Sequence, residues 1–440
     1  MMNDLELQLN DFSPTKRAQA LEALIAAGVQ PAGEQETVNL HCHTFFSFNA
    51  YGYSPIALAW LAKQKGFKAL GIVDFDVLDG VEEFLNACEH LALRGSAGME
   101  TRVYIQDFSK REINSPGEPG IYYYMGIGFT SGQIPADIAP ILADIRRRAD
   151  QRNRVMMDRL NIHLSPVMVD YVRDVLPLTP TGNTTERHLL AAYTRAATDY
   201  FADPAPFWAK KLDLSEEQVR TQIADAPGFQ NIIRAKLMKR GGVGYTRPGP
   251  DTFPTIEEVN RLIVACGALP CAAWLDGTST GEQAIEELLD LLVSKGVVAF
   301  NIIPDRNWNI SDPEVRRVKV QNLYRVVELA QKLDLPLNIG TEMNSYGQKL
   351  ADDFDAPELV PLRKPFLAGA YFIYGHTIMQ RTLGLGYQSE WAKSYLLTRR
   401  ERNAFYTQMG RLIPPGRAGV GQLKQLTSAL SPTEMLGKLS

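Results

Sequence analysis

The 440-residue sequence predicts an α/β fold in which seven strands form a barrel. Three observations lead to this prediction. Short apolar runs rich in β-branched residues alternate with segments of helical spacing, which indicates a parallel sheet. Seven such runs are present, and this number favours a barrel over an open sheet. Polar side chains follow several of the runs directly, where reactive groups lie in a parallel barrel.

The first part of the chain contains one leading helix and four of the predicted strands. Ser13 and Pro14 begin a helix that Gly28 ends, since Ser suits the N-cap, Pro the first turn and Gly the C-terminus. Ser54 and Pro55 begin another helix in the same way. The four strands are expected at 38–44, 68–73, 98–105 and 121–127, and the helices between them at 54–65 and 81–93.

The second part supplies the remaining strands, at 268–274, 297–303 and 335–341, with helices at 281–294 and 313–333. A long helical region at about 137–250 separates the fourth strand from the fifth. Its arginine-rich run at 145–154 is either a solvated helix face or a phosphate or nucleic-acid patch. We therefore predict an N-terminal helical extension at 1–36, a barrel at 37–345 interrupted by the insertion, and a C-terminal helical extension at 346–440.

Composition excludes several classes of protein. The net charge of −4 argues against a broad basic face for nucleic acid, but it allows a small basic pocket. The four cysteines form no CxxC pair, which favours a reduced, cytoplasmic setting. No apolar run approaches the roughly 20 residues of a membrane span. Phosphate-loop, dinucleotide-binding and GxSxG motifs are absent from the sequence.

His41 and His43 are the most informative residues of the chain. Side chains alternate along a strand, so the two imidazoles point to one face and Cys42 points to the other. A cysteine–histidine nucleophile is therefore disfavoured, whereas two imidazoles on one face suit a metal ion. The alternative is that they are two unrelated polar residues.

Further polar residues follow the predicted strands and should meet at one mouth of the barrel. They are Asp74, Asp76, Glu100, Asp305, Arg306, Glu342 and Asn344. Histidines and carboxylates that converge in this way are typical ligands of a divalent cation. A cation would also relieve the repulsion between the carboxylates.

Several of these segments resemble the PHP (polymerase and histidinol phosphatase) superfamily. Residues 40–44 (Leu-His-Cys-His-Thr) are similar to its opening HxH motif, residues 69–76 to its second strand, and residues 98–100 to its third motif. Segments of the insertion, at 146–160, 185–189 and 240–248, resemble the branch of nucleotide-directed phosphoesterases that carries a helical insertion. The resemblance covers roughly 37–345 and implies a distorted (β/α)7 barrel of PHP type.

The resemblance also implies a metal site, but a reduced one. The family typically holds three metal ions, and one group of its ligands corresponds to His41, His43, Glu100 and Glu342. The positions of the other ligands hold residues that bind metal poorly or not at all: Asn49, Phe75, Tyr123, Trp274 and Asn344. We therefore expect a single divalent ion per chain, zinc, manganese or iron.

Roles for other residues follow from motif position and chemistry. Asp74 would orient a ligand histidine or carry a proton, and His188 would also handle protons; their alternatives are a strand-end cap and a structural histidine. Three guanidinium groups match phosphate oxygens, although arginines are often surface or ion-pair residues. They belong to Arg102, Arg187 and Arg306. Trp274 would form the floor of a substrate pocket or fill the space of a lost metal.

The predicted function is metal-dependent hydrolysis of a phosphate ester in a small phosphorylated metabolite or nucleotide. One ion cannot clamp both the attacking and the leaving oxygen, so slow turnover or a non-phosphate substrate is expected. The alternative is a non-catalytic PHP-like protein that binds a ligand or a partner at the same mouth. Hydrolysis of a carbon–nitrogen bond is a third option.

Overall fold

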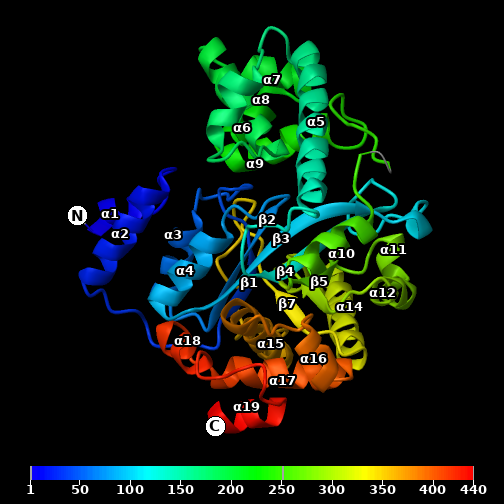
Figure 1. Ribbon diagram of the computed structural model, residues 1–440. Helices are drawn as coiled ribbons and strands as arrows, with labels where there is room; N and C mark the ends of the chain where they lie inside the picture. The colour runs from blue at the N-terminus through cyan, green and yellow to red at the C-terminus, as the bar shows by residue number, and fades with distance from the viewer. Residues whose placement is uncertain (1, 250–251, 440) are drawn as a thin grey trace.

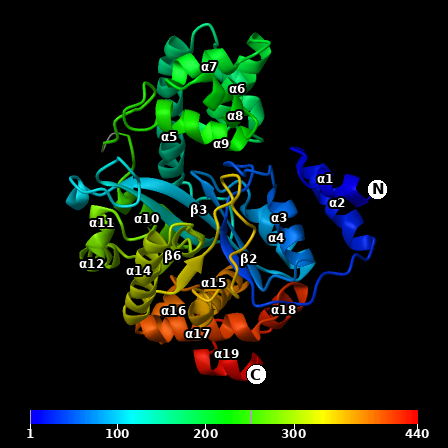
Figure 2. The ribbon, with the colours of Figure 1, turned by 180° about the vertical axis from the view of Figure 1, so that it is seen from behind.

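A computed structural model describes residues 2–249 and 252–439 of the chain. Its centre is one sheet of seven strands in which every strand pairs with its neighbours in sequence. Helices surround the sheet (Figures 1 and 2). The strands are β1 (Val38–Cys42), β2 (Ala69–Phe75), β3 (Arg94–Tyr104), β4 (Ile121–Phe129), β5 (Leu269–Trp274), β6 (Ala299–Ile302) and β7 (Leu337–Ile339).

All seven predicted strands are present, but the sheet is not wholly parallel. β4 runs antiparallel to both β3 and β5. The link from β3 to β4 contains only a short 3₁₀ turn (Gln106–Phe108), whereas parallel strands are usually joined by a crossover helix. The reversal places Tyr123 opposite Arg102 at the end of β3. The first half of β4, and not its last residues, therefore reaches the mouth of the barrel.

The barrel closes between β1 and the segment after β7. The His43 amide donates to the Glu342 carbonyl at 2.7 Å, and the Glu342 amide donates to the His41 carbonyl at 2.7 Å. Glu342 and Met343 have positive φ angles of 66° and 57°, so the backbone bends sharply where the strand would continue. Closure sets Glu342 beside the HxH pair, although almost 300 residues lie between them.

Helices of ordinary amphipathic pattern cover the outside of the barrel. α3 begins at Ser54, whose hydroxyl accepts from the Ala57 amide, and α14 begins at Asp312, which caps two amides. The predicted helix at 281–294 is divided at Ala284. These helices are α3 (Pro55–Gln64), α4 (Val81–Leu91), α10 (Ile256–Ala265), α11 (Thr280–Gln283), α12 (Ile285–Ser294), α13 (Asp305–Trp308) and α14 (Pro313–Lys332).

The N-terminal helices are α1 (Met2–Gln8) and α2 (Pro14–Ala26), and Phe12 between them and Arg17 of α2 both contact Phe45 in the loop that follows β1. Arg17 of α2 is only 2% exposed and forms a two-point ion pair with Glu83 of α4. Its guanidinium also lies 5.1 Å from the centre of the Phe45 ring. This extension therefore braces the segment directly after His43.

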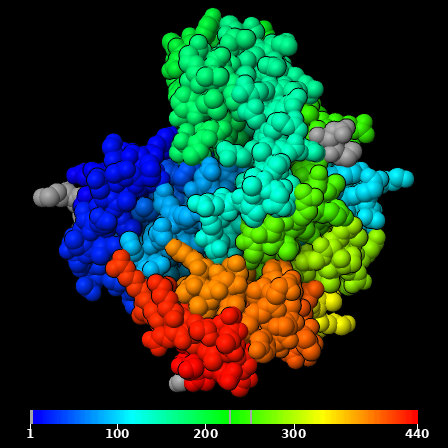
Figure 3. All heavy atoms as spheres, in the orientation of Figure 1, coloured from blue at the N-terminus to red at the C-terminus, as the bar shows by residue number. Residues whose placement is uncertain are grey.

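The insertion forms a separate lobe above the barrel mouth (Figures 1 and 3). Its long helix α5 joins the two parts, because Leu142 and Ile145 belong to the barrel core and Met156 and Leu160 to a second core inside the lobe. The elements of the lobe are α5 (Ala139–Leu164), a π turn (Tyr171–Val175), a 3₁₀ turn (Leu176–Leu178), α6 (Glu186–Tyr200), α7 (Ala205–Leu212), α8 (Glu216–Ile223), α9 (Ala226–Ile233) and a second π turn (Arg234–Met238).

The C-terminal helices close the opposite end of the barrel (Figure 1). α15 (Arg363–Leu383) contacts β1, β3, β4 and β7 and shares the barrel core. It approaches α17 (Arg399–Leu412) closely, since a Cβ atom on Gly375 would lie 2.0 Å from the Tyr406 carbonyl oxygen. The remaining elements are a 3₁₀ turn (Val360–Leu362), α16 (Glu390–Tyr395), α18 (Arg417–Leu423) and α19 (Pro432–Leu439). No helix in the described ranges is long and apolar enough to cross a membrane.

Candidate metal centre and cavity

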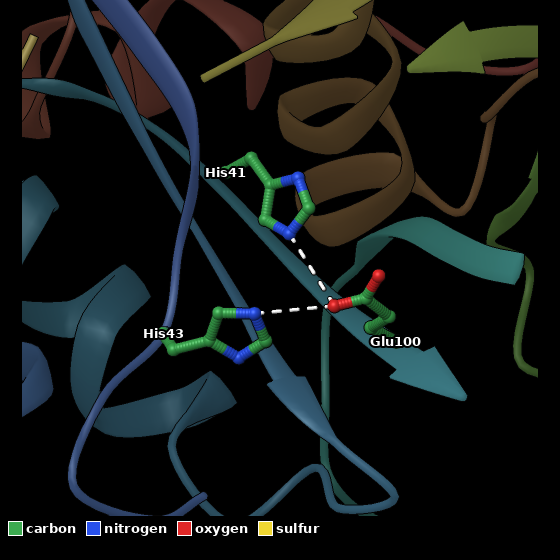
Figure 4. Close-up of side chains that lie close together, drawn as sticks. All are labelled: His41, His43 and Glu100. Atoms are coloured by element: carbon green, nitrogen blue, oxygen red, sulfur yellow. Dashed lines mark ion pairs between the residues drawn. The ribbon is translucent and has the colours of Figure 1, made fainter. Parts of the chain in front are cut away.

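Three buried side chains converge at the mouth of the barrel (Figure 4). His41 and His43 come from the end of β1, and Glu100 comes from β3, two strands away. Glu100 Oε2 lies 3.5 Å from His41 Nε2 and 3.1 Å from His43 Nε2. One ligand atom from each residue falls within 4.8 Å of the other two. The structure thus brings three of the four predicted metal ligands together.

The second nitrogen of His41 is held by an amide. His41 Nδ1 lies 3.2 Å from Asn301 Oδ1, and this oxygen also accepts from Asn338 Nδ2 at 2.9 Å. An amide oxygen only accepts, so His41 Nδ1 is the donor and Nε2 keeps its lone pair. Asn301 therefore sets the tautomer in which Nε2 faces Glu100.

His43 is oriented through Ser47 and Asp74. His43 Nδ1 lies 3.2 Å from Ser47 Oγ, and the Ser47 hydroxyl donates to Asp74 Oδ1 at 2.7 Å. Asp74 also accepts from the Thr44 amide and the Thr44 hydroxyl, both at 2.7 Å. Asp74 is 2% exposed, and burial raises its pKa. The predicted catalytic Asp74 thus lies behind His43, in a position that orients this imidazole and faces no open space.

The donor set and its geometry fit a divalent metal ion. His41 Nε2, His43 Nε2 and Glu100 Oε2 are buried and have no hydrogen bond of good geometry, although they face one another. Zinc bonds of about 2.0–2.1 Å in a tetrahedron place ligand atoms about 3.3–3.4 Å apart, close to the two separations observed. Two histidines and one glutamate are also the protein ligands of known catalytic zinc sites that keep one position open.

The electrostatics of the cluster agree with this fit. Burial alone would raise the pKa of Glu100, but the two imidazoles lower it to about 2. Burial would likewise lower the pKa of His41, and the Glu100 carboxylate raises it instead. Glu100 is therefore a carboxylate that requires positive charge beside it, which a metal ion would provide.

Glu342, the fourth predicted ligand, lies beside the cluster but turns to other partners. Its Oε2 accepts from Arg306 Nη2 at 2.8 Å and from Gln348 Nε2 at 3.0 Å. Burial opposes its ionisation, yet Arg306 lowers the pKa of the carboxyl. Its oxygens do not belong to the group within 4.8 Å.

Aromatic and amide side chains occupy the positions at which the family resemblance implies further metal ligands. The Phe75 ring stacks on His43 with centroids 4.3 Å apart, and Tyr123 lies 6.3 Å from Phe75. Asn49 is tied to the backbone, since its Nδ2 donates to the His43 carbonyl at 2.8 Å. The part of the chain that the structure describes contains one cluster of three or more metal-binding side chains, the cluster above.

A cavity of about 630 Å³ lies between the barrel mouth and the insertion. Glu100 and Glu342 line it from the barrel, together with all four predicted substrate-binding residues. These are Arg102, Arg187, Trp274 and Arg306. His188 is not among the lining residues: its Nδ1 accepts from the Thr185 amide at 3.0 Å, and its ring packs against Phe48. The side chain of the predicted catalytic His188 therefore closes the capping box at the start of α6, where Thr185 is the N-cap.

Positive charge exceeds negative charge in the cavity wall. Among the described lining residues, seven carry a cationic side chain and five a carboxylate. Several are paired, such as Arg102 with Glu118 at 2.9 Å. Burial, followed by the nearby Arg234, lowers the pKa of Arg187 to about 10, and burial with Arg102 does the same to Arg152. An anionic ligand would relieve this excess of positive charge.

The charged lining residues that were not among the predicted site residues include Arg152, Glu186, Arg234 and Lys239. Arg152 lies in the arginine-rich run whose role the sequence left open. Glu186 accepts from Arg234 at 2.7 Å and from Lys239 at 3.0 Å. Arg234 and Lys239 carry no local sequence signal, because they meet Glu186 only when the lobe folds.

Residues 39–235 match the family model of the PHP domain. No curated protein matches the chain in sequence. An amidohydrolase structure from Chromobacterium violaceum, with bound sulfate and no metal, is similar over 75% of this chain and 96% of its own, with 16% identity and a TM-score of 0.49. A Bifidobacterium adolescentis protein assigned as a metal-dependent phosphoesterase covers 76% of this chain and 98% of its own, with 19% identity and a TM-score of 0.47. The family match includes His41, His43 and Glu100.

Proposed function

We propose that this chain, whose residues 39–235 match the family model of the PHP domain, is a metal-dependent hydrolase of phosphate esters. One divalent ion would be held by His41, His43 and Glu100. The observation that supports this proposal is a cluster of three unpartnered ligand atoms beside a cavity with excess positive charge. A bound ion there would polarise a phosphoryl oxygen and lower the pKa of a bound water molecule.

The chemistry of the cavity favours a phosphorylated substrate of small size. Guanidinium groups from the barrel (Arg102, Arg306) and from the lobe (Arg152, Arg187) border one enclosed space. Their planar N–H forks match phosphate oxygens. A volume of about 630 Å³ suits a metabolite or a mononucleotide better than a polymer.

A single ion is favoured by what surrounds the cluster. Phe75 takes the space next to His43, Tyr123 lies beside Phe75, and Arg306 pairs with the Glu342 carboxylate. With one ion, charge on the attacking and leaving oxygens is neutralised less completely than with two or three. We therefore expect slow turnover compared with enzymes that hold several ions.

The same replacements favour a second candidate, a non-catalytic protein that binds a phosphorylated ligand. In it, the cavity would still bind the anion, but no hydrolysis would follow. Metal content and turnover separate the two candidates, since a chain with neither metal nor turnover supports the second.

The direct test compares the parent chain with His43→Ala and Glu100→Gln. We expect about one metal ion per parent chain by elemental analysis after purification without chelator, and hydrolysis in a screen of p-nitrophenyl phosphate and nucleoside monophosphates. Both variants should lose the ion and about 100-fold or more of the activity. His90→Ala, at an exposed position on α4, is the matched control.

Two outcomes would contradict the proposal. Variants that hydrolyse as fast as the parent chain would exclude this cluster from the reaction. Two or more tightly bound ions per parent chain would contradict the single-ion site.

A further inference from the structure

Arg306 lies at the barrel mouth on α13, directly after β6. Among the described residues, its guanidinium makes one hydrogen bond, from Nη2 to Glu342 Oε2 at 2.8 Å. A guanidinium carries five N–H donors, so four are left without a protein acceptor. The side chain is 43% exposed and lines the cavity, so these donors are accessible to a ligand there.

Glu342, the partner of Arg306, lies beside the metal-binding cluster but directs its carboxylate away from it. Its backbone pairs with that of His41 and His43, which places it next to the cluster. Its carboxylate, however, is held by Arg306 and Gln348 on the cavity side. Without Arg306, it would be a second buried carboxylate close to Glu100, and the two would repel each other unless a cation lay between them.

We propose that Arg306 has two linked roles: it keeps the Glu342 carboxylate out of the metal coordination sphere, and it binds the phosphoryl group of the substrate with its free N–H donors. The first role leaves the metal with three protein ligands and therefore with open positions. The second supplies a permanent positive charge opposite the ion. This inference rests on the function proposed above for the same site.

Zinc and inorganic phosphate are the probes that test the two roles. Zinc affinity is measured by competition with a chromophoric chelator, and phosphate binding to the zinc-loaded protein by calorimetry. In Arg306→Ala, phosphate binding should weaken about 10- to 100-fold, since a charge-assisted hydrogen bond is lost. Zinc affinity should rise about tenfold, because Glu342 becomes available as a ligand.

The double variant Arg306→Ala/Glu342→Gln separates direct binding from charge balance. We expect its zinc affinity to return to within about twofold of the parent value, while phosphate binding stays weak. Recovery of phosphate binding would show that Arg306 only neutralises Glu342, and it would overturn the second role. Glu342→Gln alone should leave zinc affinity within about twofold, and a loss of tenfold or more would make Glu342 a ligand and overturn the first role.

Arg306→Lys keeps the charge and is the second variant if Arg306→Ala does not fold. It should hold Glu342 and leave zinc affinity unchanged, but lose about threefold or more in phosphate binding because the planar fork is gone. Unchanged phosphate binding in this variant would overturn the inference. Arg325→Ala, which removes a surface pair with Glu286 at 2.6 Å, is the matched control.

These measurements do not require turnover, so the two proposals fail separately. If the variants show the expected zinc and phosphate affinities but the parent chain hydrolyses no ester, the proposed function is contradicted and the roles of Arg306 stand. A chain that hydrolyses esters with its ion, but whose Arg306→Ala variant binds phosphate as the parent does, contradicts only the inference about Arg306.

Discussion

His43 owes its orientation to a relay of two polar side chains behind it. Ser47 accepts from His43 and donates to Asp74, and Asp74 is fixed by Thr44. A metal-ligating imidazole needs such a partner on its second nitrogen, because this partner fixes both the tautomer and the ring plane. Asp74 therefore contacts Thr44 and Ser47 directly and reaches His43 only through Ser47.

Removing Ser47 tests this relay. Ser47→Ala should weaken metal binding about tenfold or more, since His43 Nδ1 loses its acceptor. Chelator competition with zinc measures the change, and Ser294→Ala, on the exposed end of α12, is the control. An affinity within twofold of the parent value would show that the relay does not position His43.

At the scale of single residues, the sequence predicted the three clustered side chains but not the residues that hydrogen-bond to them. Strand alternation and family resemblance were enough to select His41, His43 and Glu100. They did not reveal Asn301 or Ser47, because a ligand's hydrogen-bond partner depends on packing across the barrel. They also named His188, whose side chain completes the capping box of α6 with Thr185 in the structure.

The N-terminal helices support the loop that follows β1. α2 contacts α3 and the segment after β1, and Arg17 is the centre of this contact. Arg17 Nε donates to Glu83 at 2.8 Å, and Nη1 donates to the Asp11 carbonyl at 2.7 Å. The extension thus joins α4 to the loop that contains Ser47.

Arg17→Ala should destabilise the protein by about 3 kcal/mol, because Glu83 is left partly buried without its partner. Zinc affinity should fall as well, since Phe45 loses its contact and the adjoining loop loosens. Urea unfolding and chelator competition measure the two effects. Lys16→Ala, which removes an exposed pair with Asp11, should cost less than about 0.5 kcal/mol. Equal costs for the two variants would contradict the bracing role.

Sequence periodicity identified the strands but could not give the direction of β4. An apolar run reads alike in a parallel and an antiparallel strand when both of its faces are buried. In the structure, the link before β4 (residues 105–120) contains a short 3₁₀ turn and no crossover helix, which fits an antiparallel pair. The position of Tyr123 at the mouth depends on this reversal.

Two buried histidines make the stability of the whole molecule depend on pH. Burial lowers the pKa of both His188 and His376 to about 4. His188 Nδ1 accepts from the Thr185 amide, and His376 Nδ1 accepts from the Tyr387 amide. Protonation of either imidazole at Nδ1 would turn this nitrogen into a donor that faces the N–H of the amide. Both imidazoles are therefore neutral in the folded protein at pH 7.

The sign of the effect follows from linkage. Unfolded histidine binds a proton near pH 6.5, whereas the folded residues do so only near pH 4, so stability is complete above pH 6.5 and is lost as the pH falls toward 4. Each residue accounts for about 3 kcal/mol of this loss. In urea unfolding at several pH values, His188→Gln and His376→Gln should flatten the dependence, and the exposed His90→Gln should not. An unchanged slope in both buried variants would contradict this account.

Barrel closure at Glu342 has a consequence for the order of events during synthesis. The clustered side chains of His41, His43 and Glu100 leave the ribosome early, but Asn301, which contacts His41, follows 260 positions later. Contacts so distant in sequence form late in folding. A nascent chain therefore displays loosely held imidazoles long before the pocket exists, and the three-residue cluster cannot be fixed until the last strand has joined the first.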